Sequence, residues 1–271
     1  MSIRRKRNEH VFKPGKIPPD QYVIIIADGR DFGSLISGSF RKPFDYEFHF
    51  LMVDTANAVM ESKSGEEILL AYVKSDEIYF LFNPGTKLLR RDSAAISSSV
   101  SGSVSAIFTN KLIQKGKDGF GAFRTEILTA PSLDEVVSIY TEAQKDAYVN
   151  AVNTYVAKKE NVLCSKGFEK NLISDILFDF LASMPLGNEK LIYGSLAHRE
   201  EVRQKYKVIY TSGEGASHSS VSVKRPIRIS PIGLFSKRNP NLRKIIFYAF
   251  TEKMRKYYQG RPQMNYSPGA V

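Results

Sequence analysis

The chain has 271 residues, 42% of them hydrophobic, which is enough for one large domain or for a domain with an appendage. No apolar run is long enough for a membrane span, and no apolar stretch of a secretory signal follows the basic start. The single cysteine, Cys164, excludes an internal disulfide. With only four scattered histidines the sequence also excludes a structural zinc site, so we expect a cytoplasmic protein whose metal, if any, has oxygen ligands.

The formal net charge of +11 is concentrated at the two ends of the chain. Residues 221–271 hold 11 Lys and Arg residues against one acid, Glu252, and residues 1–20 hold six bases against two acids. Basic ends on a nearly neutral body indicate a polyanionic partner such as a nucleic acid. The alternative is a basic tail that only aids solubility.

The first elements are predicted from prolines and apolar periodicity. Residues 1–20 contain three prolines and predict an irregular arm, whereas the β-branched run at 22–27 predicts a buried strand. Helical periodicity covers about 44–60, directly after Pro43. The apolar runs 68–73 and 78–82 are separated by four polar residues, which predicts a hairpin.

A weaker helix is predicted over residues 90–109, since its apolar positions are diluted by serines and Gly102. A strand is expected over 120–128. Ser132 and Glu135 form a capping-box pattern that opens a helix at Leu133, and a second helical segment follows through Lys158.

The order strand, helix, strand, strand, helix, strand predicts an α+β fold, with a ferredoxin-like split βαβ antiparallel sheet on which helices pack. We divide the chain into a basic arm (1–20), a catalytic domain (21–160), a helical extension (161–220) and a basic C-terminal segment (221–271). The extension includes a predicted helix at 168–183 and ends in a Gly/Ser-rich stretch at 212–222.

Three carboxylates are expected to meet at one edge of this sheet. Asp28 ends the first strand, and Asp76 and Glu77 lie in the hairpin turn of strands that neighbour it. Carboxylates brought together repel one another unless a cation lies between them, and Mg²⁺ uses few carboxylates and completes its shell with phosphates and water. Two such ions would assist an in-line displacement. The alternative is that these acids are only turn residues.

An ordered set of segments resembles the tRNA-His guanylyltransferases and their Thg1-like relatives. IIIADGRDFGSL and FRKPFDYEFHF match a D-G-R-x-F turn and an F-x-K-P-x-D helix start, and LLAYVKSDEIYF and LLRRDS match an A-Y-x-x-S-D-E hairpin and an R-R-x-S helix. FRTEILTAPSLDEVVSIYTEAQKDAYVNAVNTY, LCSKGFEKNLISDIL and MPLGNEKLIYGSLAHR are similar to later segments of that family. The resemblance covers about residues 20–200.

The resemblance implies a polymerase-palm-like domain that joins the α-phosphate of a nucleotide to an RNA 5′ end. It implies Asp28 and Asp76 as ligands of two Mg²⁺ ions, Gly29 as a carbonyl ligand, and Glu77 as a neighbouring acid. It implies nucleotide-binding roles for a further set of residues: Phe32, Lys42, Asp45, Arg91, Ser93, Asn150 and Lys170. Phosphoryl transfer depends on positioning and charge neutralisation, which such residues supply. Alternatively, Lys42 is a solvated lysine, Arg91 belongs to an exposed helix start, and Lys170 pairs with a nearby acid.

Three departures favour one branch of the family. Tyr148 and Ala151 stand where members specific for tRNA-His usually carry a His and an Asn, and Gly33 stands where His is frequent. The losses favour templated repair of truncated tRNA 5′ ends, with ATP or GTP activating the 5′ end, over addition of a single G to tRNA-His. The family also implies a homo-oligomer, commonly a tetramer. The sequence is also compatible with a palm-based nucleotide cyclase or with a non-catalytic RNA-binding module.

Overall fold

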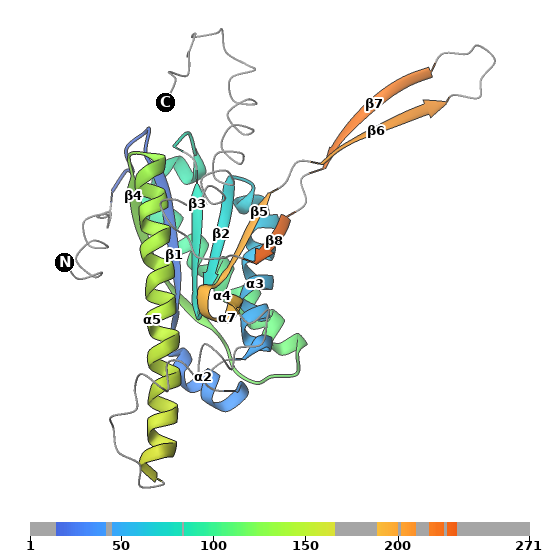
Figure 1. Ribbon diagram of the computed structural model, residues 1–271. Helices are drawn as coiled ribbons and strands as arrows, with labels where there is room; N and C mark the ends of the chain where they lie inside the picture. Colours follow the sequence, from blue (N-terminus) through green and yellow to red (C-terminus); the bar gives the residue numbers. More distant parts are fainter. Residues whose placement is uncertain are drawn as a thin grey trace.

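A computed structural model describes residues 15–41, 45–82, 84–165, 189–199, 202–209, 217–224 and 227–231. Its centre is a six-stranded antiparallel sheet in the order β4-β1-β3-β2-β5-β8 (Figure 1). The first four strands are β1 (Tyr22–Arg30), β2 (Ile68–Lys74), β3 (Glu77–Phe82) and β4 (Ala122–Ala130). Their order, β4-β1-β3-β2, is that of the predicted split βαβ arrangement, so the α+β fold class is confirmed.

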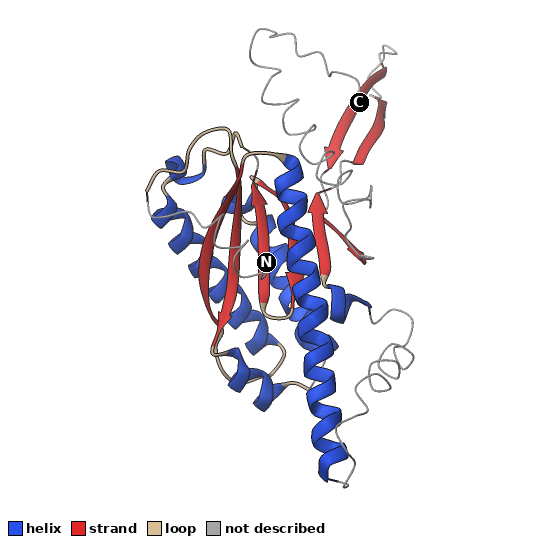
Figure 2. Cartoon of the chain, turned by 60° about the vertical axis from the view of Figure 1, so that its left-hand side comes forward, coloured by secondary structure: helices blue, strands red, loops and turns tan. Residues whose placement is uncertain are grey.

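Helices cover both faces of the sheet (Figures 1 and 2). α3 (Tyr46–Glu61) and α4 (Ser93–Gln114) pack on one face, and the long α5 (Leu133–Ser165) runs along the other. Side chains of a strand alternate between faces, so Ile25 belongs to the core under α3 and α4 while Ile24 and Ile26 belong to the core under α5. Burial from both sides explains why β1 is apolar at consecutive positions.

Side-chain caps begin three of the helices. Asp45 accepts hydrogen bonds from Glu47 N (2.7 Å) and Phe48 N (3.1 Å) at the start of α3. Asp92 accepts one from Ala95 N at 3.0 Å before α4. The predicted cap of α5 is confirmed, since Ser132 Oγ accepts from Glu135 N at 3.2 Å. Each bond satisfies a backbone donor that the helix leaves without a partner.

The structure differs from the predicted elements in several places. Lys74 pairs with Glu77 across the hairpin, so the turn contains two residues, Ser75 and Asp76, and not four. The two helical segments predicted after Leu133 are one helix, α5, and the short α2 (Phe32–Ser39) was not predicted. The ion pair between the polar Lys74 and Glu77 explains why the ladder continues past the apolar runs.

The helical extension expected over 161–220 contains strands as well as α7 (Glu189–Tyr193) among its described residues. β5 (Ser195–Arg199) adds to the free edge of β2, and β8 (Ile227–Pro231) pairs with β5. β6 (Val202–Ile209) and β7 (Ser217–Lys224) form a separate two-stranded ribbon that includes much of the Gly/Ser-rich stretch. The helix predicted at 168–183 lies outside the described residues.

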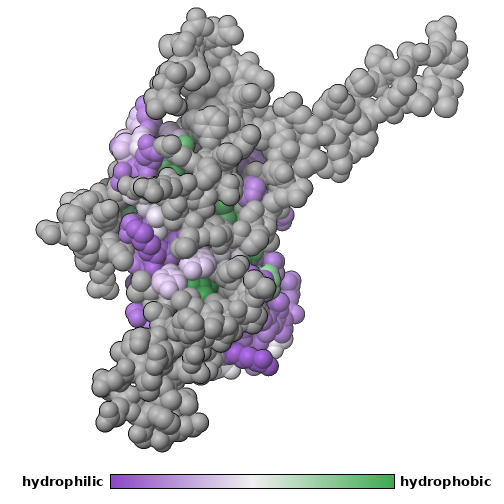
Figure 3. All heavy atoms as spheres, viewed as in Figure 1, coloured by the Kyte–Doolittle hydropathy of each residue, from purple (hydrophilic) through white to green (hydrophobic). Residues whose placement is uncertain are grey.

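Hydrophilic side chains cover most of the described surface on the face drawn in Figure 3, with small apolar areas between them. Within the described residues, no helix combines the length and the apolar character that a membrane span requires.

Candidate active site

Four charged residues form one row across the end of the sheet. In the strand order β2-β3-β1-β4, Lys74 pairs in register with Glu77, Glu77 with Asp28, and Asp28 with Arg124. Because Ile24 and Ile26 face α5, Asp28 faces the same side, and its row partners do so with it. The two acids therefore lie beside each other with a base at each end.

Each acid of the row is held by the base next to it. Arg124 donates from Nε (2.9 Å) and Nη2 (2.6 Å) to Oδ2 of Asp28. Lys74 Nζ lies 3.2 Å from Oε2 of Glu77, and the hydroxyl of Tyr79 donates to the same oxygen at 2.7 Å. These contacts offset the repulsion between two neighbouring carboxylates.

Asp76 lies in the turn beside this row. Its carbonyl accepts from Gly29 N at 3.0 Å, which joins the turn to the end of β1, and its Oδ1 accepts from the Ser75 hydroxyl at 3.0 Å. Burial raises the pKa of the Asp76 carboxyl, and the charges of Asp28 and Glu77 raise it further. The hydrogen bonds from its own N–H and from Ser75 lower this pKa, but they do not outweigh the increase. No cation among the described residues pairs with Asp76. Within the described residues, the Asp76 carboxyl therefore has no basic partner, unlike Asp28 and Glu77.

The donors at this edge suit a hard cation. Asp28 and Asp76 supply carboxylate oxygens, and Gly29 supplies a carbonyl next to them. Within the described part of the chain, no group of three or more His, Cys, Asp and Glu side chains is arranged to hold an ion by itself. A cation here would therefore take the rest of its shell from water or from a bound substrate, as Mg²⁺ commonly does.

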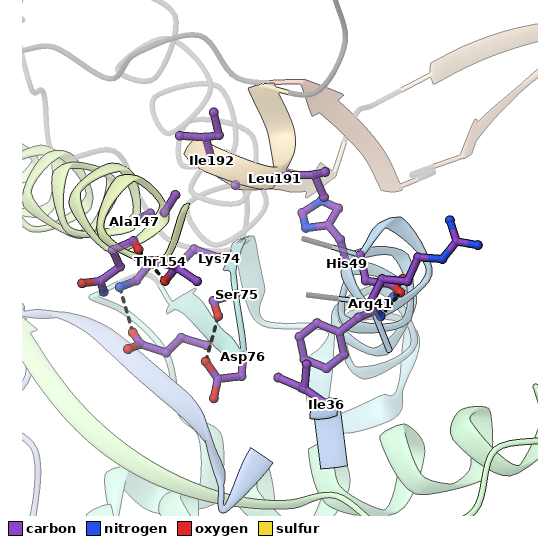
Figure 4. A pocket seen from close by; sticks show the side chains of 16 residues that line it. Ile36, Arg41, His49, Lys74, Ser75, Asp76, Ala147, Thr154, Leu191 and Ile192 are labelled. Atoms are coloured by element: carbon purple, nitrogen blue, oxygen red, sulfur yellow. Dashed lines mark hydrogen bonds and ion pairs between the residues drawn. The ribbon is translucent and has the colours of Figure 1, made fainter. Parts of the chain in front are cut away.

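A pocket of about 180 Å³ opens beside the hairpin turn (Figure 4). Figure 4 shows Lys74, Ser75 and Asp76 on the hairpin, with Ala147 and Thr154 of α5 on one side and Arg41 and His49 on the other. α7 contributes Leu191 and Ile192. The pocket lining includes four residues from the predicted site: Asp45, Asp76, Glu77 and Asn150.

Asp45 is held at the pocket wall by its role as a helix cap. Besides capping α3, its Oδ2 accepts from Arg41 N at 2.7 Å. Burial alone would raise the pKa of Asp45, but the bonds from the N–H groups of Arg41, Phe48 and Glu47, together with the charge of Lys117, lower it. Asp45 is therefore a fixed carboxylate at the pocket.

Sequence reasoning missed a polar pair at the wall of the pocket. His49 Nε2 lies 2.8 Å from Ser195 Oγ, and both side chains are buried. Burial, with a smaller effect of the Lys190 charge, lowers the pKa of His49 to about 4, so the imidazole is neutral near pH 7. The two residues are 146 positions apart, and no local pattern indicates such a contact.

Three predicted nucleotide-binding residues have other partners in the structure. Phe32 is 2% exposed and packs on Phe108 and Phe123. A Cβ on Gly29 would lie 2.6 Å from the Phe32 ring, so this packing requires glycine at position 29. Phe32 does not line the pocket.

Arg91 and Ser93 bind the backbone of the segment before β1, and Arg91 also binds the backbone of the loop after β3. The Arg91 guanidinium donates to carbonyls that include those of Ile17 (3.0 Å) and Pro84 (2.8 Å), and Ser93 Oγ accepts from Gly15 N at 2.9 Å. Neither residue lines the pocket. Their nucleotide contacts, like that of Phe32, stay predictions, while Lys42 and Lys170 lie outside the described residues.

Comparisons with known proteins give one matching family model and several structures of similar fold. The family model described as tRNAHis guanylyltransferase, Thg1, matches residues 4–160. The crystal structure of tRNA(His) guanylyltransferase from Saccharomyces cerevisiae is similar at a TM-score of 0.56 and 21% identity, covering 68% of this chain and 88% of the yeast chain. A comparison with curated proteins gave no match.

Two bacterial structures are similar over more of the chain. A bacterial tRNA(His) guanylyltransferase (Thg1)-like protein in complex with ATP has a TM-score of 0.56 and 21% identity, covering 82% of this chain and 89% of its own. The structure of such a bacterial protein in complex with GTP has a TM-score of 0.59 and 18% identity, covering 90% and 97%. Likenesses at these identities concern the fold.

Proposed function

Because its residues 4–160 match the family model, the chain belongs to the tRNAHis guanylyltransferase family and is a nucleotidyltransferase, and we propose that it adds nucleotides in the 3′-to-5′ direction to truncated 5′ ends of tRNA or a related RNA. ATP or GTP would activate the 5′ end. The bacterial relatives in complex with ATP and with GTP support this choice of substrates.

The observation that carries the proposal is the meeting of Asp28, Asp76 and Glu77 beside a pocket lined by Asp45, the N-cap of α3, and by Asn150 of α5. Ligand pockets commonly have about 300–1,000 Å³, so a cavity of about 180 Å³ suits part of a nucleotide, such as its base. The edge that carries Asp28, Asp76 and Glu77, next to the pocket, is then the place for the phosphates, with Mg²⁺ between the phosphates and the carboxylates. This arrangement favours phosphoryl transfer by positioning and charge neutralisation.

In the proposed reaction the RNA 5′-monophosphate first attacks the α-phosphorus of ATP or GTP, and pyrophosphate leaves. The 3′-hydroxyl of an incoming nucleoside triphosphate then attacks the activated 5′-phosphorus, and the nucleoside monophosphate leaves. Asp28, Asp76 and the Gly29 carbonyl would hold Mg²⁺, which when bound neutralises phosphate charge and lowers the pKa of the attacking hydroxyl. Asp45 and Asn150 would orient the nucleotide in the pocket.

Two residues of α5 support templated repair over recognition of tRNA-His. Tyr148, at the position where tRNA-His-specific members usually carry His, stacks on Tyr193 of α7 with a centroid distance of 5.8 Å and an interplanar angle of 6°. Ala151, at the position of the family's second Asn, is buried and presents only a methyl group to the pocket. Ala151 has no hydrogen-bonding side chain, and the Tyr148 ring is engaged by Tyr193, so the imidazole and the carboxamide that tRNA-His-specific members usually carry are both replaced here. Selection by base pairing with the opposite strand needs no such group.

The test is a nucleotide-addition assay in which the full chain is incubated with tRNA transcripts as acceptors, Mg²⁺ and labelled nucleoside triphosphates. Transcripts of several tRNAs lacking the first 5′ nucleotide should each be extended by the nucleotide complementary to the opposite strand, and changing the opposite base should change the nucleotide added. Addition of G to intact tRNA-His alone, opposite an unpaired position, would contradict the repair proposal. Asp76→Asn is the inactive control.

A further inference from the structure

The two bases at the ends of the charged row differ in how firmly they are held. The Lys74 side chain is 5% exposed and pairs with Glu77, whereas the Arg124 side chain is 75% exposed and pairs with Asp28, itself 19% exposed. Exposed ion pairs are weak, since water and salt screen them. The contact of Arg124 with Asp28 can therefore be exchanged at low cost, and that of Lys74 with Glu77 cannot.

The contact of Arg124 also uses only one oxygen of the carboxylate. Both Nε (2.9 Å) and Nη2 (2.6 Å) lie on Oδ2 of Asp28, so the pair lacks the two-oxygen fork that makes Arg–carboxylate contacts strong. A divalent cation held by Asp28 and Asp76 would compete with this guanidinium for the same carboxylate charge. Two positive groups at one carboxylate repel each other, so binding of one weakens the other.

We propose that Arg124 is an exchangeable counter-ion of this site. It neutralises Asp28 while no divalent cation is bound, and it turns to the phosphates of the nucleotide once a cation takes its place. The guanidinium suits the second partner, because its planar set of donors matches phosphate oxygens and keeps its charge at any working pH. The inference rests on the proposed function, since it assumes that Asp28 helps to hold the cation.

The test measures binding and not turnover, with the full chain and its Arg124→Gln variant. Mn²⁺ is titrated without nucleotide and the free ion is followed by electron paramagnetic resonance. Loss of the competing guanidinium should tighten Mn²⁺ binding by up to about fivefold. Affinity for GTP with Mg²⁺, measured by calorimetry, should instead fall about tenfold, because a charge-assisted contact to phosphate is lost.

Arg30→Gln is the matched control. Arg30 lies at the end of the same strand as Asp28, is 73% exposed and pairs with Asp31 at 3.6 Å, so its loss changes the net charge equally without touching Asp28. It should change Mn²⁺ affinity and GTP affinity less than about twofold, as expected for an exposed charge that makes no contact with Asp28.

The outcomes separate this inference from the proposed function. If the wild-type chain binds Mn²⁺ and Arg124→Gln has the affinities of wild type, or shifts both no more than Arg30→Gln does, the role of Arg124 is refuted and the cation site stands. If the wild-type chain binds no Mn²⁺ with or without GTP, the proposed cation site itself is refuted. Opposite shifts in the two affinities, confined to Arg124→Gln, support the exchange.

Discussion

Replacing Arg91 by alanine should destabilise the protein more than it impairs nucleotide binding. The guanidinium donates to five backbone carbonyls, some before β1 and some after β3: those of Ile17, Pro18, Gln21, Pro84 and Thr86. One side chain thus fixes residues 17–21 to the loop before α4. Such a contact is a structural clamp, and its removal leaves polar backbone groups without partners.

The clamp also holds an unfavourable backbone. Leu89, Arg90 and Arg91 have φ angles of 45°, 55° and 58°, in the left-handed region. Each such residue costs about 1–2 kcal/mol in a non-glycine chain, and this cost is met only while the surrounding contacts persist. Hydrogen bonds to a charged donor contribute about 1.5–3 kcal/mol each when buried, but several of these carbonyls can regain water. We therefore expect Arg91→Ala to lose about 3 kcal/mol of unfolding free energy.

Urea unfolding followed by circular dichroism measures this loss, and Arg90→Ala is the control. Arg90 is the exposed neighbour, with the same charge and nearly the same φ, and its replacement should change stability by about 0.5 kcal/mol or less. In the folded fraction of Arg91→Ala, KM for the nucleoside triphosphate should stay near the wild-type value. A loss below about 1 kcal/mol together with a large increase in KM would refute the clamp and favour the triphosphate contact that the family resemblance implies.

Three further predictions concern the site and its walls. His49 has a pKa of about 4 in the folded chain and about 6.5 unfolded, so between these values the unfolded state binds a proton that the folded state does not. The free energy of unfolding should therefore fall by up to about 3 kcal/mol as pH falls from 6.5 to 4. Urea titrations across this range should show a smaller fall for His49→Gln, and a profile equal to that of the wild type would contradict the buried neutral imidazole. Asp76→Asn should abolish nucleotide addition. It should also raise the melting temperature of the metal-free chain, because it removes the charge that Asp28 and Glu77 repel. A lower melting temperature would contradict that repulsion. Gly194→Ala should lower the free energy of unfolding, measured in urea, by about 2 kcal/mol or more. The reason is that φ at this position is +83° and the new Cβ would collide with the carbonyl oxygen of Val73. Wild-type stability of the variant would contradict this constraint on the turn before β5.

The parts of the fold that sequence reasoning predicted depend on local patterns. The apolar run of β1, the spacing of α3 and the Ser132 cap each report on their own few residues, and the order of elements then predicts the sheet order. The convergence of Asp28 with Asp76 and Glu77 followed from that order. These predictions needed no knowledge of distant contacts.

The parts that were missed depend on contacts between distant segments. β5 is a short strand whose place is decided by the free edge of β2, and the partners of His49 and Arg91 lie far along the chain. Arg91 has the same local surroundings whether it binds a triphosphate or a set of carbonyls. Charge and periodicity do not distinguish these two roles of Arg91, because the local sequence is the same for either role.

The pocket is assembled from two stretches of chain, and the family model matches only one of them. Asp28, Asp76 and Glu77 lie inside residues 4–160, where the family model matches. The part of the pocket wall made by Leu191, Ile192 and Gly194 lies beyond that match. Substitutions in α7 can therefore reshape what the pocket admits while the acidic edge stays as it is. Under the proposed function, part of the wall that faces the nucleotide is thus supplied by a different segment of the chain from the one that supplies Asp28, Asp76 and Glu77.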